Sequence, residues 1–235
     1  MQPIAPGIYA LEGLKMGRSY LVEDDDGLLL IDTSSNGAAP AILRAIESIG
    51  RRPDDLKTIV ATHYHHDHTG NVAALIERTG ATFCAHTTEA PYIDGREPWM
   101  EMKGVFGPLS GGQEKRHYAL KVERELHSGE VLPFAGGIEV VPAPGHTPGQ
   151  IALHAKARGV LFSADAFMNA AGLMLPVSMS THDMAEAKRT ITRLAELEFD
   201  IALPGHGRPL IGRANEKLGE WSRRWFPHSA AGVTA

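Results

Sequence analysis

A histidine-rich stretch, "THYHHDHTG" at residues 62–70, holds the residue types of this chain that are best suited to chemistry. It directly follows the apolar run "LKTIVA", which predicts a buried strand. His63, His65 and Asp67 are spaced two residues apart. Side chains alternate along an extended segment, so these three would share one face. The stretch therefore predicts a cluster of imidazole and carboxylate groups at the end of a strand.

The two remaining histidines depend on how the chain turns. His66 has the opposite parity and would face away, whereas His68 joins the others only if the chain bends at Asp67, as the "TG" that follows predicts. Neutral imidazoles and carboxylates are good ligands for zinc and similar metals. Four histidines without a metal would repel one another if they became charged together. A metal site is therefore favoured over a solvated polar loop.

Three later segments also end an apolar run in a potential ligand. They are "IEVVPAPGH", "GVLFSAD" and "FDIALPGH", which end in His146, Asp165 and His206. Glycine or small residues beside each one let backbone and metal approach closely. If the four strand ends meet at one edge, they supply five histidines and two aspartates. This set of ligands fits two metal ions better than one.

The intervening segments must bring these ends together. Short apolar runs separated by Gly and acidic turns predict strands, and helical spacing predicts four helices near 38–49, 71–78, 181–196 and 215–225. Thr181 is the expected N-cap of the third helix. Strands and helices mix in both halves without a linker, which predicts one domain over residues 1–227 with helices outside two layers of sheet.

Two segments lack a regular pattern. Residues 91–118 are rich in Gly, Pro, Met and aromatic residues, which predicts a lid-like insertion. Its candidates for a substrate pocket are Tyr92, Trp99, Met102 and Phe106. These side chains would cover an apolar acyl group or ring, or else pack on the scaffold or against a second copy in a homodimer. Residues 228–235 are expected to form a flexible tail.

Composition excludes some partners. The net charge of −5 argues against nucleic acid or an anionic membrane as a partner and favours a small-molecule substrate. No apolar run reaches the length of a membrane span, and the N-terminal residues do not resemble a signal peptide. Cys84 is the only cysteine, which suits a reducing compartment, so a cytoplasmic location is expected.

The motifs taken together resemble the metallo-β-lactamase-fold hydrolases. The matching segments are "THYHHDH", "PGHTPG", "SAD" and "LPGHG", at residues 62–68, 144–149, 163–165 and 203–207, in the order in which the family has them. The resemblance implies an α+β fold, a four-layer αββα sandwich. It also implies two divalent metal ions, for which zinc is the first expectation and manganese, iron or cobalt are alternatives.

The resemblance also implies a role for each matched residue. Three histidines would bind the first metal: His63, His65 and His146. Three residues would bind the second: Asp67, His68 and His206. Asp165 would bridge both metals, and Asp32 at the end of "LLLID" would support the site from behind the ligands. Asp67 would also be catalytic, because it would orient a hydroxide that bridges the metals.

Departures from the family pattern narrow the activity. An aspartate at 165 resembles the glyoxalase II and lactonase branches more than true β-lactamases, which usually have Cys or Ser there. The glutathione-binding residues typical of glyoxalase II and the active-site tyrosine of acyl-homoserine lactonases cannot be placed in this chain. The resemblance therefore implies a zinc-dependent hydrolase of a small ester, lactone or thioester.

Other activities of the same fold remain open. One alternative is a promiscuous β-lactamase, and another is a phosphodiesterase or sulfatase-type hydrolase. A metal or redox protein without hydrolytic activity is a third, against which the complete set of ligands argues.

Overall fold

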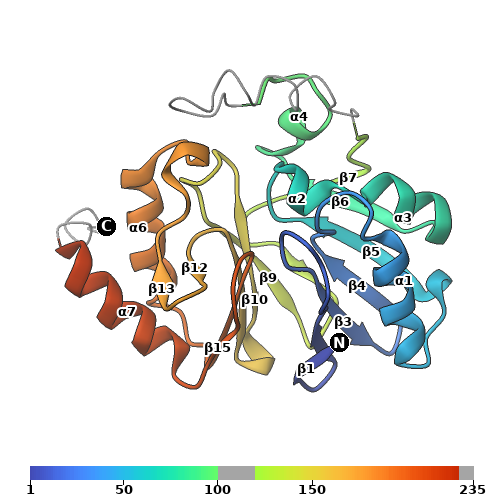
Figure 1. Ribbon diagram of the computed structural model, residues 1–235, viewed down its shortest axis with the longest axis horizontal. Coiled ribbons are helices and arrows are strands. Elements are labelled where there is room, and N and C mark those ends of the chain that lie inside the picture. Colours follow the sequence, from blue (N-terminus) through green and yellow to red (C-terminus); the bar gives the residue numbers. More distant parts are fainter. Residues whose placement is uncertain (100–119, 228–235) are drawn as a thin grey trace.

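Two stacked β-sheets with helices on their outer faces form the protein, as seen in a computed structural model (Figure 1). The structure describes residues 1–99 and 120–227. The arrangement of helix, sheet, sheet and helix is the four-layer αββα sandwich that the motifs implied.

The first sheet has seven strands that are neighbours in sequence order. Pairing is antiparallel from β1 to β4 and parallel from β4 to β7. The strands are β1 (Gln2–Ala5), β2 (Ile8–Ala10), β3 (Tyr20–Asp24), β4 (Gly27–Ile31), β5 (Leu56–Ala61), β6 (Thr82–His86) and β7 (Arg124–Leu126).

The second sheet has six strands in the order β15-β14-β11-β10-β9-β8, and only the β11–β14 pair is parallel. Its strands are β8 (Val131–Leu132), β9 (Ile138–Pro142), β10 (Ile151–Ala155), β11 (Val160–Ala164), β14 (Ile201–Pro204) and β15 (Leu210–Ile211). A separate hairpin pairs β12 (Met168–Asn169) with β13 (Leu173–Met174).

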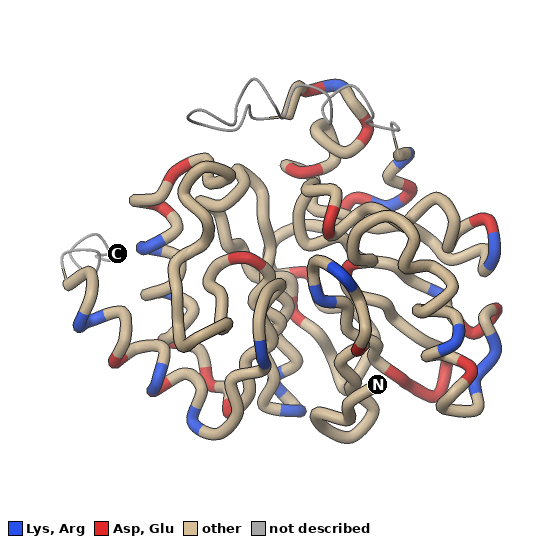
Figure 2. The backbone as a smooth tube through the Cα atoms, in the orientation of Figure 1, with Lys and Arg blue, Asp and Glu red and all other residues tan. Residues whose placement is uncertain are grey.

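Helices cover the outer face of each sheet (Figure 1). The first sheet carries α1 (Ala39–Ser48) and α3 (Val72–Thr79), and the second carries α6 (Met184–Leu194) and α7 (Ala214–Trp225). Two single turns, α2 (His66–Thr69) and α4 (Ala90–Ile93), lie near the upper edge of the first half. Lys and Arg alternate with Asp and Glu along α7 (Figure 2).

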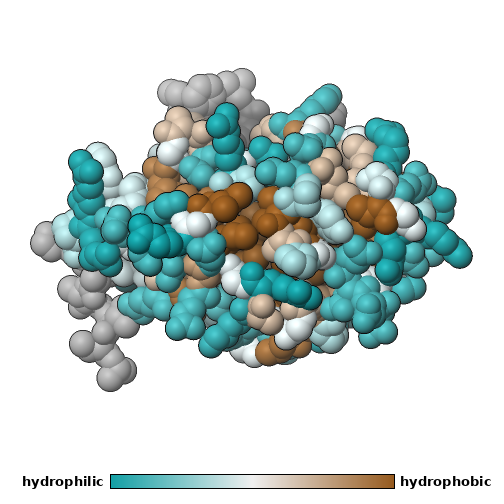
Figure 3. All heavy atoms as spheres, turned by 90° about the horizontal axis from the view of Figure 1, so that it is seen from below, coloured by the Kyte–Doolittle hydropathy of each residue, from teal (hydrophilic) through white to brown (hydrophobic). Residues whose placement is uncertain are grey.

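Three apolar layers hold this arrangement together: one between the two sheets, one under α1 and α3, and one under α6 and α7. In β4, Leu29 and Ile31 enter the core between the two sheets, whereas Leu28 and Leu30 pack beneath α1 and α3. A strand that is buried on both faces needs a continuous apolar run, which is why "GLLLI" has no polar alternation. Seen from below, hydrophobic side chains gather near the middle of a largely hydrophilic face (Figure 3).

The start of α6 differs from the sequence-based prediction. The helix was expected from Thr181, but it begins at Met184, and its N-cap is Asp183, whose side chain accepts hydrogen bonds from the backbone N–H of Ala185 and Glu186. Aspartate and threonine are both good N-caps, so the sequence alone could not separate them. Thr181 is buried instead, and its Oγ1 lies 3.1 Å from Nδ1 of the candidate ligand His146.

The insertion predicted at 91–118 is described only in part. Met102, Phe106 and the rest of 100–119 lie outside the described residues, as does the predicted tail at 228–235. Tyr92 and Trp99 pack against the apolar layer under α1 and α3. Within the two described ranges, none of the helices combines the length and the apolar character that crossing a membrane requires.

Close packing of α6 against the loop before His146 can be tested at one glycine. A Cβ at Gly145 would lie 2.3 Å from the backbone nitrogen of Ala187, and the residue has a φ of +127°. We expect Gly145→Ala to lower the free energy of unfolding by about 3 kcal/mol or more, through steric clash and backbone strain. Urea unfolding followed by circular dichroism measures it.

Gly50→Ala is the matched control. Gly50 has a φ of +77°, but no atom of the described ranges lies within 4 Å of the added Cβ, so the left-handed backbone is what opposes the change. Its cost should be about 1–2 kcal/mol. Equal losses for the two variants would contradict the close contact with α6.

Candidate metal centre

Four strand ends converge at one edge of the sandwich. His63 follows β5 of the first sheet, whereas His146 lies between β9 and β10 of the second. Asp165 follows β11, and His206 follows β14, which is the parallel neighbour of β11. The ligands predicted from distant parts of the sequence therefore come from both sheets and meet between them.

A sharp turn brings the last two residues of the opening motif into the site. His65 is extended, with φ −59° and ψ 145°, and α2 begins directly after it. This single helical turn buries Asp67 and His68 and leaves His66 exposed. The predicted bend is present, but it comes after His65 and not at Asp67, so Asp67 does not continue the extended face of His63 and His65. Gly70 permits the turn, because a Cβ there would lie 2.6 Å from the carbonyl oxygen of His66.

The predicted ligands form two neighbouring groups. One contains His63, His65 and His146, and the other contains Asp67, His68 and His206; within each group the ligand atoms lie within 4.8 Å of one another. Asp165 lies between the groups: its Oδ2 is 3.4 Å from His146 Nε2 and 3.3 Å from His206 Nε2.

Buried atoms that lack hydrogen bonds fit these residues to metal binding. His63 Nε2, His68 Nε2 and Asp165 Oδ1 are buried and have no hydrogen-bond partner among the residues that the structure describes. The same three residues form a group with ligand atoms within 4.8 Å of one another. Buried polar atoms normally find a partner, and unmatched imidazole nitrogens facing a carboxylate are the donor set that a divalent cation requires. The residues therefore fit a metal centre.

Side chains behind three of the histidines fix their orientation. His68 Nδ1 donates to Asp32 Oδ2 at 2.8 Å, and His146 Nδ1 donates to Thr181 Oγ1 at 3.1 Å. His63 Nδ1 contacts Thr62 Oγ1 at 3.1 Å, and that hydroxyl donates to Asp32. Outward bonds at Nδ1 leave Nε2 directed into the centre. Asp32 is therefore hydrogen-bonded to His68 directly and connected to His63 through Thr62.

Sequence reasoning predicted Asp32 but missed Thr62 and Thr181, and it also missed Arg18, which supports the loop of His206. Thr181 lies 35 residues from His146, and no spacing rule connects them. Arg18 lies next to the His206 loop, where its backbone N–H donates to the carbonyl of Gly205 and its Nε donates to that of Gly207. Only the folded chain brings these pairs together. Thr62 directly precedes His63 in the sequence, so this neighbour is the one missed support that the sequence could have indicated.

Burial keeps the first group neutral. Burial and the neighbouring imidazoles lower the pKa of His63 well below its ordinary value. The pKa of His65 falls to about 3, chiefly through burial and then through His146. Burial also lowers the pKa of His146. These imidazoles are therefore deprotonated at neutral pH, which is the form that binds a cation.

Carboxylates reverse this effect in the second group. Burial lowers the pKa of His68, but Asp32, Asp165 and Asp67 outweigh it and raise the pKa to about 9. Hydrogen bonds to Asp165 and Asp67 likewise overcome burial and raise the pKa of His206 to about 10. In turn, despite burial, these histidines hold the pKa of Asp67 far below its usual range and lower that of Asp165 to about 2.

Aromatic rings flank the first group. Tyr64 is buried and stacks on Tyr92, with ring centroids 5.1 Å apart, so it packs beneath the site. The Trp99 ring lies 4.9 Å from Tyr64 and 6.2 Å from His65. Trp99 Nε1 donates to the carbonyl of Tyr92, which fixes the indole beside His65. Of the two pocket candidates among the described residues, Trp99 lies beside His65, whereas Tyr92 stacks on Tyr64.

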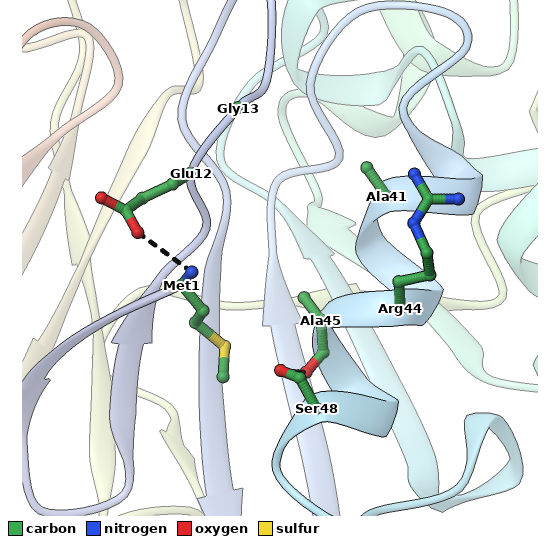
Figure 4. Close-up of a pocket in the computed structure, with 7 residues that line it drawn as sticks. All are labelled: Met1, Glu12, Gly13, Ala41, Arg44, Ala45 and Ser48. Carbon is green, nitrogen blue, oxygen red and sulfur yellow. Dashed lines mark hydrogen bonds and ion pairs between the residues drawn. The ribbon is translucent and has the colours of Figure 1, made fainter.

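A pocket of about 350 Å³ lies elsewhere, between α1 and the loop after β2 (Figure 4). Its lining consists of Met1, Glu12, Gly13, Ala41, Arg44, Ala45 and Ser48. The N-terminal amine pairs with Glu12 at 3.0 Å, and both residues lie on the side of the pocket that faces α1 (Figure 4). None of the lining residues belongs to the histidine cluster, so this pocket is separate from the candidate centre.

Comparison with known families decides the classification of this centre. The sequence model of the metallo-beta-lactamase superfamily matches residues 13–206, which include every residue of the cluster. The chain belongs to the metallo-beta-lactamase superfamily. The family model and the relatives that are named metallo-hydrolases make the chain a metallo-hydrolase of this fold, with a His/Asp cluster suited to divalent metals.

Curated relatives support the same class. The chain is 26% identical over 230 residues to the "Probable metallo-hydrolase YflN" of Bacillus subtilis, covering 89% of this chain and 87% of the relative. It is 28% identical over 192 residues to the "Acyl-coenzyme A thioesterase MBLAC2" of Gallus gallus, and the match covers 77% of this chain and 66% of the relative.

Solved structures share the fold over nearly the full length. A metallo-beta-lactamase family protein of Thermus thermophilus matches with a TM-score of 0.72 and 25% identity, over 93% of this chain and 79% of that chain. A B3 metallo-beta-lactamase described as having an active-site glutamic acid matches with a TM-score of 0.71 and 25% identity. The match covers 98% of this chain and 90% of that chain.

The raised pKa of His206 predicts how stability without metal depends on pH. A histidine whose folded-state pKa lies above its ordinary value contributes stability that is complete below pH 6.5 and is lost as pH rises through the folded value of about 10. The wild type should therefore exceed His206→Gln in free energy of unfolding most at about pH 6, and the excess should shrink toward pH 10. Urea unfolding with a chelator present measures it, and an excess that grows with pH would contradict the ion pairs.

Proposed function

We propose that this protein is a dinuclear metal-dependent hydrolase, with zinc as the metal, that cleaves a small ester, lactone or thioester. The position of Asp165 is the observation that carries the proposal. Its Oδ2 lies within 3.4 Å of a histidine from each group, so a single carboxylate is available to both. The two groups would hold one ion each, and Asp165 would contact both ions.

The residues of the centre suit hydrolysis. Two divalent ions, when bound, would lower the pKa of coordinated water and polarise the oxygen of a carbonyl substrate. Asp67 lies 3.2 Å from His206 through its Oδ2, and its low pKa keeps it ionised. A carboxylate with so low a pKa is a weak base, so Asp67 would accept a hydrogen bond from the attacking water and orient it without taking its proton.

Within this class we favour a thioester, with support from one relative and from one aromatic side chain. The relative from Gallus gallus is named an acyl-coenzyme A thioesterase, and the alignment covers 77% of this chain. The indole of Trp99, 6.2 Å from His65, provides an apolar surface beside the first group. An acyl chain or ring would pack against this surface while its carbonyl approaches the centre.

Hydrolysis of β-lactams is the second candidate. Its support is the structural similarity to a B3 metallo-beta-lactamase over 98% of this chain. Asp165 argues for a wider range of carbonyl substrates, because the motif comparison places Cys or Ser at this position in true β-lactamases. A β-lactam would then be a slow, secondary substrate.

Substitution of single ligands tests the proposal. We expect His63→Ala and Asp165→Ala each to remove bound metal and to lower kcat/KM by a factor of at least about 10³, because the hydrolytic water needs the ions. Elemental analysis would count the metals per chain. Turnover would be measured on a panel of thioesters, lactones, β-lactams and phosphodiesters with the zinc and manganese forms.

His66→Ala is the matched control, because His66 belongs to the same motif but is exposed. It should keep both the metals and the activity. Wild-type protein with one metal or none, or turnover that persists after complete metal removal, would refute the proposed function.

Trp99 provides a separate test of the substrate surface. We expect Trp99→Ala to raise KM for substrates with an apolar acyl group by about threefold to tenfold and to leave kcat within about twofold, since only ground-state packing is lost. The control is Trp225→Ala on α7, whose side chain is 66% exposed. An unchanged KM for Trp99→Ala would show that the indole only packs on the scaffold.

A further inference from the structure

Glu89 is a buried carboxylate with no role in the proposed chemistry. It follows β6 and is 0% exposed. Among the residues that the structure describes, its hydrogen-bond partners are two backbone N–H groups and a hydroxyl, and none is a cation. Burial raises the pKa of its side chain to about 7, although these hydrogen bonds oppose the rise. Such burial is costly, so a specific contribution is expected in return.

The three donors belong to two loops that carry metal-ligand candidates. Oε2 accepts the backbone N–H of Tyr64 at 2.8 Å. Oε1 accepts the Thr147 hydroxyl at 2.8 Å and the backbone N–H of Gly149 at 2.7 Å. Tyr64 lies between His63 and His65 in the first half of the molecule, whereas Thr147 directly follows His146 in the second half. The Glu89 carboxylate therefore connects the loop that carries His63 and His65 with the loop that carries His146.

Packing around Glu89 is tight enough to transmit its position. A Cβ added at Gly149 would lie 2.5 Å from Thr88 Cβ and 3.0 Å from the backbone nitrogen of Glu89. On the other side, the carbonyl of Glu89 accepts the N–H of Tyr92, and the Tyr92 ring stacks on Tyr64. Neither loop can move relative to Glu89 without losing hydrogen bonds or steric contacts.

A carboxylate is the group that this position requires. An ionised carboxylate only accepts hydrogen bonds, so it matches three donors at once. Glutamine has the same shape, but its NH₂ group would face either Tyr64 N–H or the pair formed by Thr147 and Gly149. Two donors in contact repel, so the amide would keep one loop and release the other.

We propose that Glu89 is a positioning residue that sets the separation between the loop of His63 and His65 and the loop of His146. The inference rests on the proposed function, because it takes these three histidines to be the ligands of one metal. Glu89 itself contacts neither metal nor substrate and acts through the backbone on both sides.

Glu89→Gln tests this role, with metal binding as the readout. We expect its first metal to be bound at least about tenfold more weakly, the range seen when outer partners of metal ligands are lost. Chelator competition with zinc measures the affinity. The visible spectrum of the cobalt(II) form reports ligand geometry and should change in band position and intensity.

Glu125→Gln is the matched control. Glu125 lies on β7 and also accepts a threonine hydroxyl, that of Thr87 at 2.8 Å, but its side chain is 43% exposed and far from both loops in sequence. Its affinity and cobalt spectrum should equal those of the wild type. Thermal unfolding of the metal-free variants separates a loss of stability from a loss of metal affinity.

The outcomes are distinct. Wild-type affinity and an unchanged cobalt spectrum in Glu89→Gln, whatever its stability, would overturn the positioning role and leave the proposed function intact. Wild-type protein that binds no metal would overturn both. If Glu89→Gln does not fold, Thr147→Val removes only one donor; weaker metal binding there supports the role, and unchanged binding and spectrum refute it.

Discussion

The carboxylate of Asp165 shared between two groups of histidines is the contact on which the rest of the structure depends. His146 and His206 both lie within 3.4 Å of its Oδ2, and they arrive on different loops of the second sheet. His68 reaches Asp165 from the first sheet, with Nε2 at 3.6 Å from Oδ1. A shift of one sheet against the other would change these distances, so the apolar core between the sheets also sets the geometry of the polar centre.

Concentrating so many polar groups in a buried space has a cost, which hydrogen bonds from outside the centre reduce. Asp32 illustrates this: it accepts from the backbone and the hydroxyl of Thr62 and from His68, and it adopts a left-handed φ of 58° to do so. The two groups of histidines therefore differ in charge. His63, His65 and His146 are neutral at neutral pH, whereas His68 and His206 hold protons in the field of the carboxylates until a cation replaces them.

One short segment, residues 89–99, serves the first group in two ways. At its start, the Glu89 carboxylate binds the loops on both sides of the group; at its end, the Trp99 indole lies beside His65. Tyr92 joins the two by stacking on Tyr64 and accepting the indole N–H at its carbonyl. The proposed ligand geometry and the proposed substrate surface would therefore respond together to movement of this segment.

The sequence by itself determined the chemistry, because residue type and local parity are properties of the chain. The residue types of the "THYHHDHTG" stretch marked it as a ligand cluster, and the "TG" after it predicted a bend, although the chain turns after His65 and Asp67 therefore lies in the helical turn with His68. Strand ends flanked by glycine or small residues marked His146, Asp165 and His206. The motifs also implied the αββα sandwich, which the two sheets confirm. Tertiary structure alone decided which distant residues support the ligands. Thr181, expected as a helix cap, holds His146, and Arg18 holds the His206 loop. Glu89 looks like an ordinary loop carboxylate in the sequence. Its burial and its three donors depend on two loops meeting across the sandwich, and no local pattern encodes that contact.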